Sequence, residues 1–246
     1  MNYLLYAILG IAPSIIWLLF YLHKDLNPEP KRTVLLVFLG GAFMGPVAIL
    51  AQFLAMAALT SSAQWPHFFE TLSQNRYLFF INVVLFAPLS EEFLKYLVVK
   101  WQVLKNPDFD EPLDAMIYLI ISALGFAATE NLLNIFLMPG VTLQLAFSQA
   151  LARFLSATFL HALTSGILGY FIARSLFLFK RKNVIFISGF LLAVALHSFY
   201  NYLAWLFNAE KIIALAIALL LAAMGGVVGW QFRRLKKQLA VCKIKY

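Results

Sequence analysis

Two adjacent carboxylates and a lysine lie inside a long apolar stretch, because Glu91, Glu92 and Lys95 fall within the run from Tyr77 to Val99. This run is long enough to cross a lipid bilayer as a helix, which takes about 20 residues. An ionised side chain near the bilayer centre costs roughly 2.5–3.5 kcal/mol on insertion scales, so such groups persist where they pair or perform chemistry. We interpret the three residues as the centre of an active site.

Helical geometry places the lysine between the two acids. At about 100° per residue, Lys95 lies roughly 40° from Glu91 and 60° from Glu92, so one cation can neutralise either carboxylate. Pro88 cannot donate a hydrogen bond to the carbonyl of Val84, which predicts a kink with free backbone polar groups beside the acids. The alternative is a buried ion pair that only joins helices, and this alternative does not require a second acid.

A third acid lies in the next apolar run. Phe126, Glu130 and Asn134 recur at four-residue spacing, so they share one face of a helix. The alternative for Glu130 is a protonated, hydrogen-bonded glutamic acid, since burial disfavours the charged form. If both helices begin where we expect, Glu130 lies nearer the outer surface than Glu91.

Two histidines lie near the middle of two later runs. His161 shares a helical stripe with Thr158 and Ser165, which predicts a polar seam entering the bundle. His197 and Asn201 are one helical turn apart and can point at the same atom, as in an oxyanion site. A lone membrane histidine usually makes a packing hydrogen bond, but two histidines and three acids on four separate helices favour a functional site.

One cation of the fifth run is left out of this chemistry. Arg153 lies nearer the outer end of its run, and we expect it to reach the membrane surface or to pair with a loop acid.

The composition is that of an integral membrane protein. Hydrophobic residues make up 63% of the chain and charged residues 12%, with a mean hydropathy of +0.84, whereas soluble domains carry about 25% charged residues. Cys242 is the single cysteine, so a disulfide framework and a cysteine metal cluster are both excluded. The net charge of +8 fits cytoplasmic loops better than nucleic-acid binding.

We expect an all-α fold, a polytopic transmembrane helix bundle with about seven spans. We also expect a single domain, residues 1–246, with its core motifs in residues 77–206. The predicted spans are 3–22, 33–58, 77–99, 114–136, 145–173, 184–206 and 211–231.

Charge asymmetry gives the orientation, with the N-terminus outside and the C-terminus cytoplasmic. Only Arg76 and Lys211 then fall outside. The cations placed inside are Lys24, Lys31, Arg32, Lys100, Lys105, Arg174, Lys180, Arg181, Lys182, Arg233, Arg234, Lys236, Lys237, Lys243 and Lys245.

The acid-rich loop before the fourth span superficially resembles a calcium loop. It carries Asp108, Asp110, Glu111 and Asp114, but it lacks the central glycine and the terminal bidentate glutamate. We predict a solvated loop in which Asp114 caps the following helix.

Taken together, these motifs resemble the PrsW family of intramembrane proteases, part of a larger group with the CAAX prenyl endopeptidases. The motifs are Glu91-Glu92-x-x-Lys95, Phe126-x-x-x-Glu130, His161 and His197-x-x-x-Asn201, and the likeness covers roughly residues 25–206. The larger group often has an arginine after the paired acids and a histidine after the phenylalanine. Lys95 and Glu130 stand at those positions here, which favours PrsW.

The resemblance implies peptide hydrolysis, which needs an activated water, an oxyanion stabiliser and a proton donor. We expect Glu91 to act as general base, with Glu92 and Lys95 setting its charge. His197 and Asn201 would face the oxyanion. In a metal-free version, His161 and Glu130 orient the water by hydrogen bonds.

The resemblance also implies a metalloprotease, and the two versions stay open. In the metal version a zinc ion binds His161, His197 and one or two of the glutamates, with Glu92 and Glu130 as the candidates. No short zinc motif such as His-Glu-x-x-His is present.

We expect the substrate to be a membrane protein that is cut within or near its span. The resemblance implies a membrane-anchored regulatory protein in bacterial signalling, and we expect the chain itself to lie in the cytoplasmic membrane. The main rival function is a transporter or proton relay, because Glu and His chains inside spans also mark ion paths. A third hypothesis is a non-catalytic membrane scaffold that keeps a degenerate site.

Overall fold

The computed structural model describes residues 3–25, 27–59, 74–207 and 212–237, and within these ranges it contains helices and no strand. Seven helical segments of the described chain are long and apolar enough to cross a membrane, as predicted. Cys242, Lys211, Lys243 and Lys245 lie outside the described residues. The elements are α1 (Tyr3–Leu22), α2 (Lys31–Leu59), α4 (Arg76–Ile81), η2 (Asn82–Phe86), α5 (Ala87–Gln102), α6 (Asp114–Phe136), α7 (Leu143–Leu155), α8 (Ala157–Phe177), η3 (Phe179–Arg181), α9 (Lys182–Phe207) and α10 (Ile212–Lys236).

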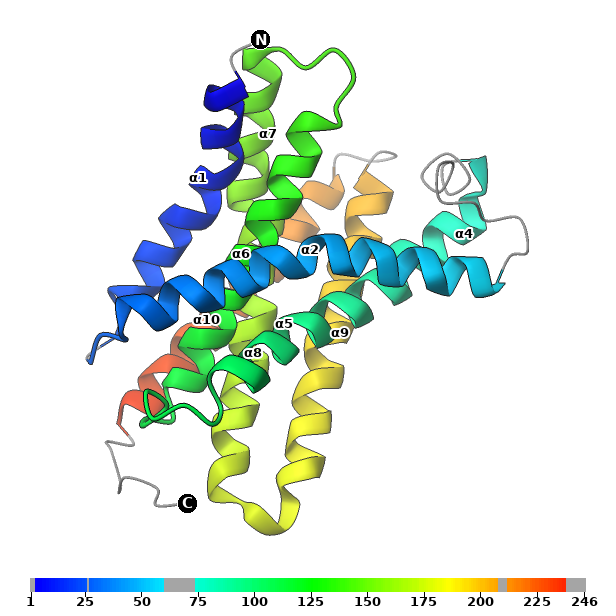
Figure 1. Cartoon of the computed structure of the whole chain (residues 1–246). Coiled ribbons are helices and arrows are strands. Elements are labelled where there is room, and N and C mark those ends of the chain that lie inside the picture. Colours follow the sequence, from blue (N-terminus) through cyan, green and yellow to red (C-terminus); the bar gives the residue numbers. More distant parts are fainter. Residues whose placement is uncertain (1–2, 26, 60–73, 208–211, 238–246) are drawn as a thin grey trace.

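Helix α6 lies at the centre of the bundle and is buried on nearly all sides. It packs against α1, α2 and α8, and α2 crosses it at a steep inclination (Figure 1). Glycines permit the close approach of α2. A Cβ on Gly125 would collide with the backbone oxygen of Phe38, and one on Gly41 would collide with that of Ser122. Small residues at helix crossings are the usual means of close packing in membranes.

The third span is interrupted by the π-helical turn η2, which directly precedes α5, the helix that carries the paired acids. In an i to i+5 ladder residue 88 would donate to the carbonyl of Val83, but Pro88 has no N–H. The side chain of Asn201 on α9 donates to that carbonyl instead, at 2.9 Å. The predicted disturbance is thus a π-helical turn, and the carbonyl it frees is bound by another helix.

The fifth span is also divided, because α7 ends at Leu155 and α8 begins at Ala157. Ser156 between them leaves helical geometry, with φ −126° and ψ −93°, and its hydroxyl donates to the carbonyl of Ala152 at 2.7 Å. The indole of Trp17 on α1 donates to the carbonyl of Phe154 at 2.9 Å and so braces this break.

The loops before α2 and α6 join through polar contacts. Tyr118 donates to Glu29 at 2.5 Å and Thr33 to Asp108 at 2.5 Å. Burial raises the pKa of Glu29 to about 9, and the nearby Asp114 carboxylate adds to the effect, while the Tyr118 hydrogen bond opposes it. The prediction that Asp114 caps α6 is wrong, because its carboxylate accepts from the backbone of the preceding loop, from Asp110 and Glu111, and residue 113 is the cap.

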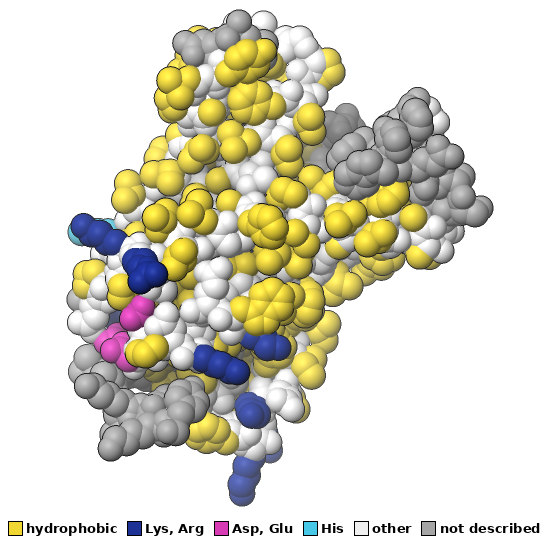
Figure 2. Space-filling model, viewed as in Figure 1, with side chains coloured by type: hydrophobic (Ala, Val, Ile, Leu, Met, Phe, Trp, Pro, Cys, Tyr) yellow, Lys and Arg dark blue, Asp and Glu magenta, His cyan; other side chains and the backbone are white. Residues whose placement is uncertain are grey.

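The outer surface matches a membrane environment. Figure 2 shows hydrophobic side chains over most of the visible face, with lysine and arginine at its left side and towards the end where α8 turns into α9. The charges therefore leave a broad apolar area on this face.

Candidate active site

Four helices bring the acids, the lysine and the histidines together inside the bundle. Glu91, Glu92 and Lys95 come from α5, Glu130 from α6, His161 from α8 and His197 from α9. The histidine rings are 5.0 Å apart between centroids. Apart from Glu130, all of these side chains are buried.

Glu92 is the best satisfied of the three acids. Its Oε1 accepts from Lys95 Nζ at 2.9 Å, His197 Nδ1 at 2.9 Å and Thr164 Oγ1 at 3.1 Å, and its Oε2 accepts from Ser165 at 3.3 Å. A carboxylate that already accepts four hydrogen bonds has little capacity left for a reacting water. Glu92 therefore holds its neighbours in place.

The contacts of His161 define its tautomer. Lys95 Nζ lies 2.7 Å from His161 Nδ1, and because an ammonium group only donates, Nδ1 accepts. The other ring nitrogen, Nε2, then carries the proton and donates to Glu130 Oε2 at 2.7 Å. His161 is thus a neutral bridge from the lysine to Glu130. The ammonium also lies 4.7 Å from the centre of the Phe126 ring.

Glu91 is the acid with an unused oxygen. Its Oε2 is buried without a hydrogen-bond partner, 3.7 Å from His197 Nε2 and 3.9 Å from Lys95 Nζ. Since His197 Nδ1 donates to Glu92, Nε2 of the neutral ring is an acceptor. A carboxylate oxygen and an imidazole nitrogen thus face each other at a distance that one water can bridge.

Arg153 belongs to this cluster, which corrects the prediction that it reaches the surface or a loop acid. It donates to Glu130 Oε2 at 2.9 Å and to the side chain of Asn131, which in turn donates to Thr158 at 3.1 Å. The break at Ser156 puts Arg153 in the last turn of α7, close to the start of α8. Sequence reasoning weighed only the depth of Arg153 along a continuous span.

Charge in the cluster is nearly balanced. With neutral histidines, Glu91, Glu92 and Glu130 are set against Lys95 and Arg153, so one negative charge remains uncompensated. A single proton or an added cation neutralises it. Glu130 is the most exposed of these charged side chains, at 27%.

The expected mismatch in depth between Glu91 and Glu130 is resolved by tilt. The third span runs from Arg76 to Gln102 and lies inclined across the bundle with α2 (Figure 1). An inclined helix gains less depth per residue, so Glu91 reaches the level of Glu130, and both lie near His161.

Asn201 and Asn134 do not join the cluster by any contact that the described residues show. Asn201 donates to Val83, and Asn134 donates to the carbonyl of Glu130 at 3.2 Å from an exposed position. His197 and Asn201 were expected to point at the same atom, but their hydrogen bonds go to different atoms, Glu92 Oε1 and the Val83 carbonyl. Thr164 and Ser165 do join the cluster, and the predicted stripe of Thr158, His161 and Ser165 was the sequence signal for Ser165.

Among the residues that the structure describes, one group could hold a metal ion: Glu91, His161 and His197, whose donor atoms lie within 4.8 Å of one another. The set differs from the predicted one, in which Glu92 and Glu130 were the carboxylate ligands. Both of those acids already accept from cations or histidines. Two histidines and a glutamate form a catalytic zinc set, so the donor types fit. His161 would have to release Lys95 or Glu130 to bind.

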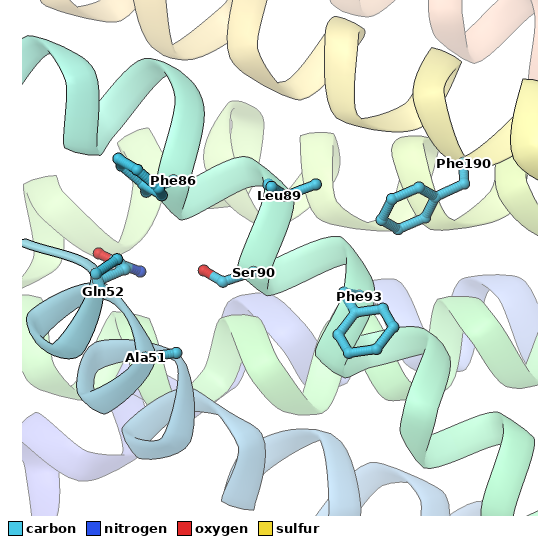
Figure 3. Close-up of a pocket in the computed structure, with 8 residues that line it drawn as sticks. Ala51, Gln52, Phe86, Leu89, Ser90, Phe93 and Phe190 are labelled. Carbon is cyan, nitrogen blue, oxygen red and sulfur yellow. The ribbon is translucent and has the colours of Figure 1, made fainter. Parts of the chain in front are cut away.

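A cavity borders α5, and neither Glu91 nor Glu92 lines it. It has a volume of about 380 Å³ and is bordered by Gln52, Leu89, Ser90, Phe93 and Phe190 (Figure 3). Positions two residues apart on a helix face opposite ways, so Leu89 and Phe93 lie opposite Glu91.

The fold and the cluster define a polytopic membrane protein with an acid–histidine centre inside its helix bundle. The PrsW family of intramembrane metalloproteases matches residues 29–227. The Protease PrsW of Geobacillus kaustophilus is 32% identical over 196 residues, which cover 79% of this chain and 77% of that protein. The chain belongs to the PrsW family and is a membrane protease.

Two further relatives agree. The Protease PrsW of Clostridioides difficile is 28% identical over 85% of this chain and 83% of its own length. The Protease PrsW of Bacillus subtilis is 28% identical over 79% of this chain and 80% of its own length. No solved structure matches the chain.

Proposed function

We propose that the protein is an intramembrane endopeptidase that hydrolyses a peptide bond within or near the span of a membrane-anchored protein. The single observation that carries this proposal is the unpartnered Oε2 of Glu91, buried 3.7 Å from His197 Nε2 and 3.9 Å from the Lys95 ammonium. A base, a second proton-transfer group and a fixed positive charge meet at one point. These are the groups that amide hydrolysis needs.

Each residue then has a role. Glu91 takes a proton from water as the hydroxyl oxygen adds to the scissile carbonyl, and it returns that proton to the leaving amine as the carbon–nitrogen bond breaks. His197 accepts a hydrogen bond from the same water through Nε2 and so orients it for attack. Lys95 supplies positive charge beside Glu91.

The remaining members act as positioning residues. Glu92 orients His197 and Lys95, while Glu130 fixes the tautomer of His161. Arg153 balances Glu130 and sets the position of Asn131. For Asn201 the bond to Val83 favours a role in holding η2 beside the acids over direct oxyanion binding.

A zinc ion held by Glu91, His161 and His197 would supply a bound water that ionises near neutral pH. The family's description as metalloproteases and the Glu/His/His group both support this version, although Lys95 now takes one nitrogen of His161. Activity measured with and without a strong chelator, beside metal analysis of the purified protein, separates the two versions. Full activity in metal-free protein eliminates the zinc version.

The proton-relay alternative loses support from membership in a protease family. We propose that the protein lies in the cytoplasmic membrane with its N-terminus outside and its C-terminus inside, and that its substrate is a membrane-anchored regulatory protein. The distribution of lysine and arginine supports this orientation.

The test of the function is cleavage of tagged single-span proteins in proteoliposomes. Glu91→Gln should abolish cleavage with little change in thermal stability, because the lost oxygen makes no hydrogen bond. Asp110→Asn, which changes an exposed loop acid, is the matched control and should cleave normally. Cleavage by Glu91→Gln at the wild-type rate would exclude Glu91 as the base.

A further inference from the structure

Another cavity, of about 480 Å³, opens between α1 and α10, and neither Glu91 nor Glu92 lines it. Tyr21 and Phe232, whose ring centroids are 5.8 Å apart, bring the two helices together through side chains. The volume of this cavity falls within the range of about 300–1,000 Å³ that is usual for ligand sites.

The walls of the cavity are aromatic and glycine residues. Trp17 stacks on Phe159 at 4.3 Å between ring centroids, and together they form the floor. On α10, Gly225 and Gly229 line the opposite side. A Cβ on Gly225 would meet only Phe159, at 3.5 Å, and one on Gly229 would meet nothing within 4 Å. The missing side chains leave an apolar trough along the helix.

One end of the same cavity is basic. Lys24, Arg233 and Lys236 line it, and α1 and α10 both end there. None of the described residues that line the cavity is acidic. The neighbouring Asp25 lies close enough to Glu29 to raise the pKa of that group, so it belongs to the acidic loops.

We propose that this cavity binds an anionic phospholipid, with an acyl chain along the trough at Gly225 and Gly229 and the phosphate headgroup at Lys24, Arg233 and Lys236. An apolar trough that ends in three cations at a membrane surface is complementary to one molecule with a long hydrocarbon chain and a negative head. Basic pockets between helices on the cytoplasmic side bind such headgroups. The site does not depend on the proposed protease activity.

Two other occupants fit less well. Residues 238–246 follow α10 and carry Lys243 and Lys245 but no acid, so three cations repel them. A second copy of the chain would offer an α1 or α10 surface of the same apolar and basic character, with no negative charge for the cations.

The test uses the full chain, purified in detergent and stripped of lipid. Binding of phosphatidylglycerol and phosphatidylcholine is measured by native mass spectrometry, with inorganic phosphate as a further arm. We expect preferential binding of phosphatidylglycerol. Lys24→Gln, Arg233→Gln and Lys236→Gln should each weaken that binding about fivefold. The matched control is Arg234→Gln, whose guanidinium lies over Trp230 and outside the cavity lining, and it should leave binding unchanged.

A second pair of variants tests the trough. Gly229→Leu should block binding, whereas Gly226→Leu, at a neighbouring open position that does not line the cavity, should not. Equal binding of both lipids, or charge variants with wild-type affinity, would overturn the proposal. Competition by inorganic phosphate alone would assign the basic end to a free anion. A tenfold gain in lipid binding after removal of residues 238–246 would assign the cavity to that segment, and a dimer abolished by Gly229→Leu would assign it to a second copy.

Discussion

Replacing Lys95 with methionine should destabilise the protein strongly, because this cation holds the centre of the cluster. The change keeps a long apolar stem and removes contacts to Glu92 at 2.9 Å and His161 at 2.7 Å. It also leaves Glu91 and Glu92 facing each other with no cation from α5. Removing one partner of a buried ion pair costs about 3–5 kcal/mol.

That cost corresponds to a fall in Tm of roughly 6–20 °C, at about 2–4 °C per kcal/mol for a chain of this size. Thermal unfolding of the purified protein, followed by tryptophan fluorescence, measures it. The matched control on the same helix is Lys100→Met, since Lys100 is exposed and lies 5.9 Å from the Tyr96 ring. We expect the control to change Tm by about 2 °C or less, as surface substitutions usually cost under about 0.5 kcal/mol.

A double variant sharpens the test. Adding Glu92→Gln to Lys95→Met removes the charge that the first change leaves unpaired, so it should recover part of the lost stability. A Lys95→Met protein as stable as wild type would refute the ion-pair interpretation. So would a double variant in which the two losses simply add.

Three further predictions follow from other contacts. Asn201→Leu should lower the free energy of unfolding by about 1–3 kcal/mol, because it leaves the Val83 carbonyl without a donor. Adding Pro88→Ala should restore part of that stability, because residue 88 then has an N–H that can donate to the same carbonyl. Thermal unfolding measures both effects. Gly125→Ala should lower Tm severely because its Cβ meets the backbone of α2. Burial raises the pKa of Glu29 to about 9, whereas the same group in the unfolded chain loses its proton above pH ~4.5. The folded loop is therefore most stable at low pH, and it should loosen as the pH rises towards 9. Hydrogen exchange at the amides of Asn27 and of residue 29, measured between pH 6 and 9, should show this loosening in wild type and not in Glu29→Gln.

The helix count and the convergence of the acids and histidines could be predicted from the sequence. Apolar runs of about 20 residues identify spans almost directly. Charged residues inside such runs must find one another, since lipid offers them no partners. Glu91, Glu130, His161 and His197 could therefore be assigned to one region before any coordinates were known.

The distribution of hydrogen bonds could not be predicted. Which acid has a free oxygen depends on rotamers set by Thr164 and Ser165, and these depend on how α8 packs against α5. For the same reason, the group that could hold a metal contains Glu91, whereas Glu92 and Glu130 were the predicted carboxylate ligands. Arg153 was excluded because periodicity treats residues 145–173 as one helix, whereas the break at Ser156 comes from local backbone geometry.

The contact between Glu130 and Arg153 also bears on how the chain enters the membrane. Glu130 leaves the ribosome 23 residues before the cation that neutralises it. If α6 entered the lipid alone, Glu130 would have no cation to neutralise it. The surfaces of α6 that pack closely against other helices, such as the one at Gly125, would face lipid instead. Insertion of residues 114–177 as one helical hairpin avoids that state, which implies that the translocon retains α6 until α7 and the start of α8 have been synthesised.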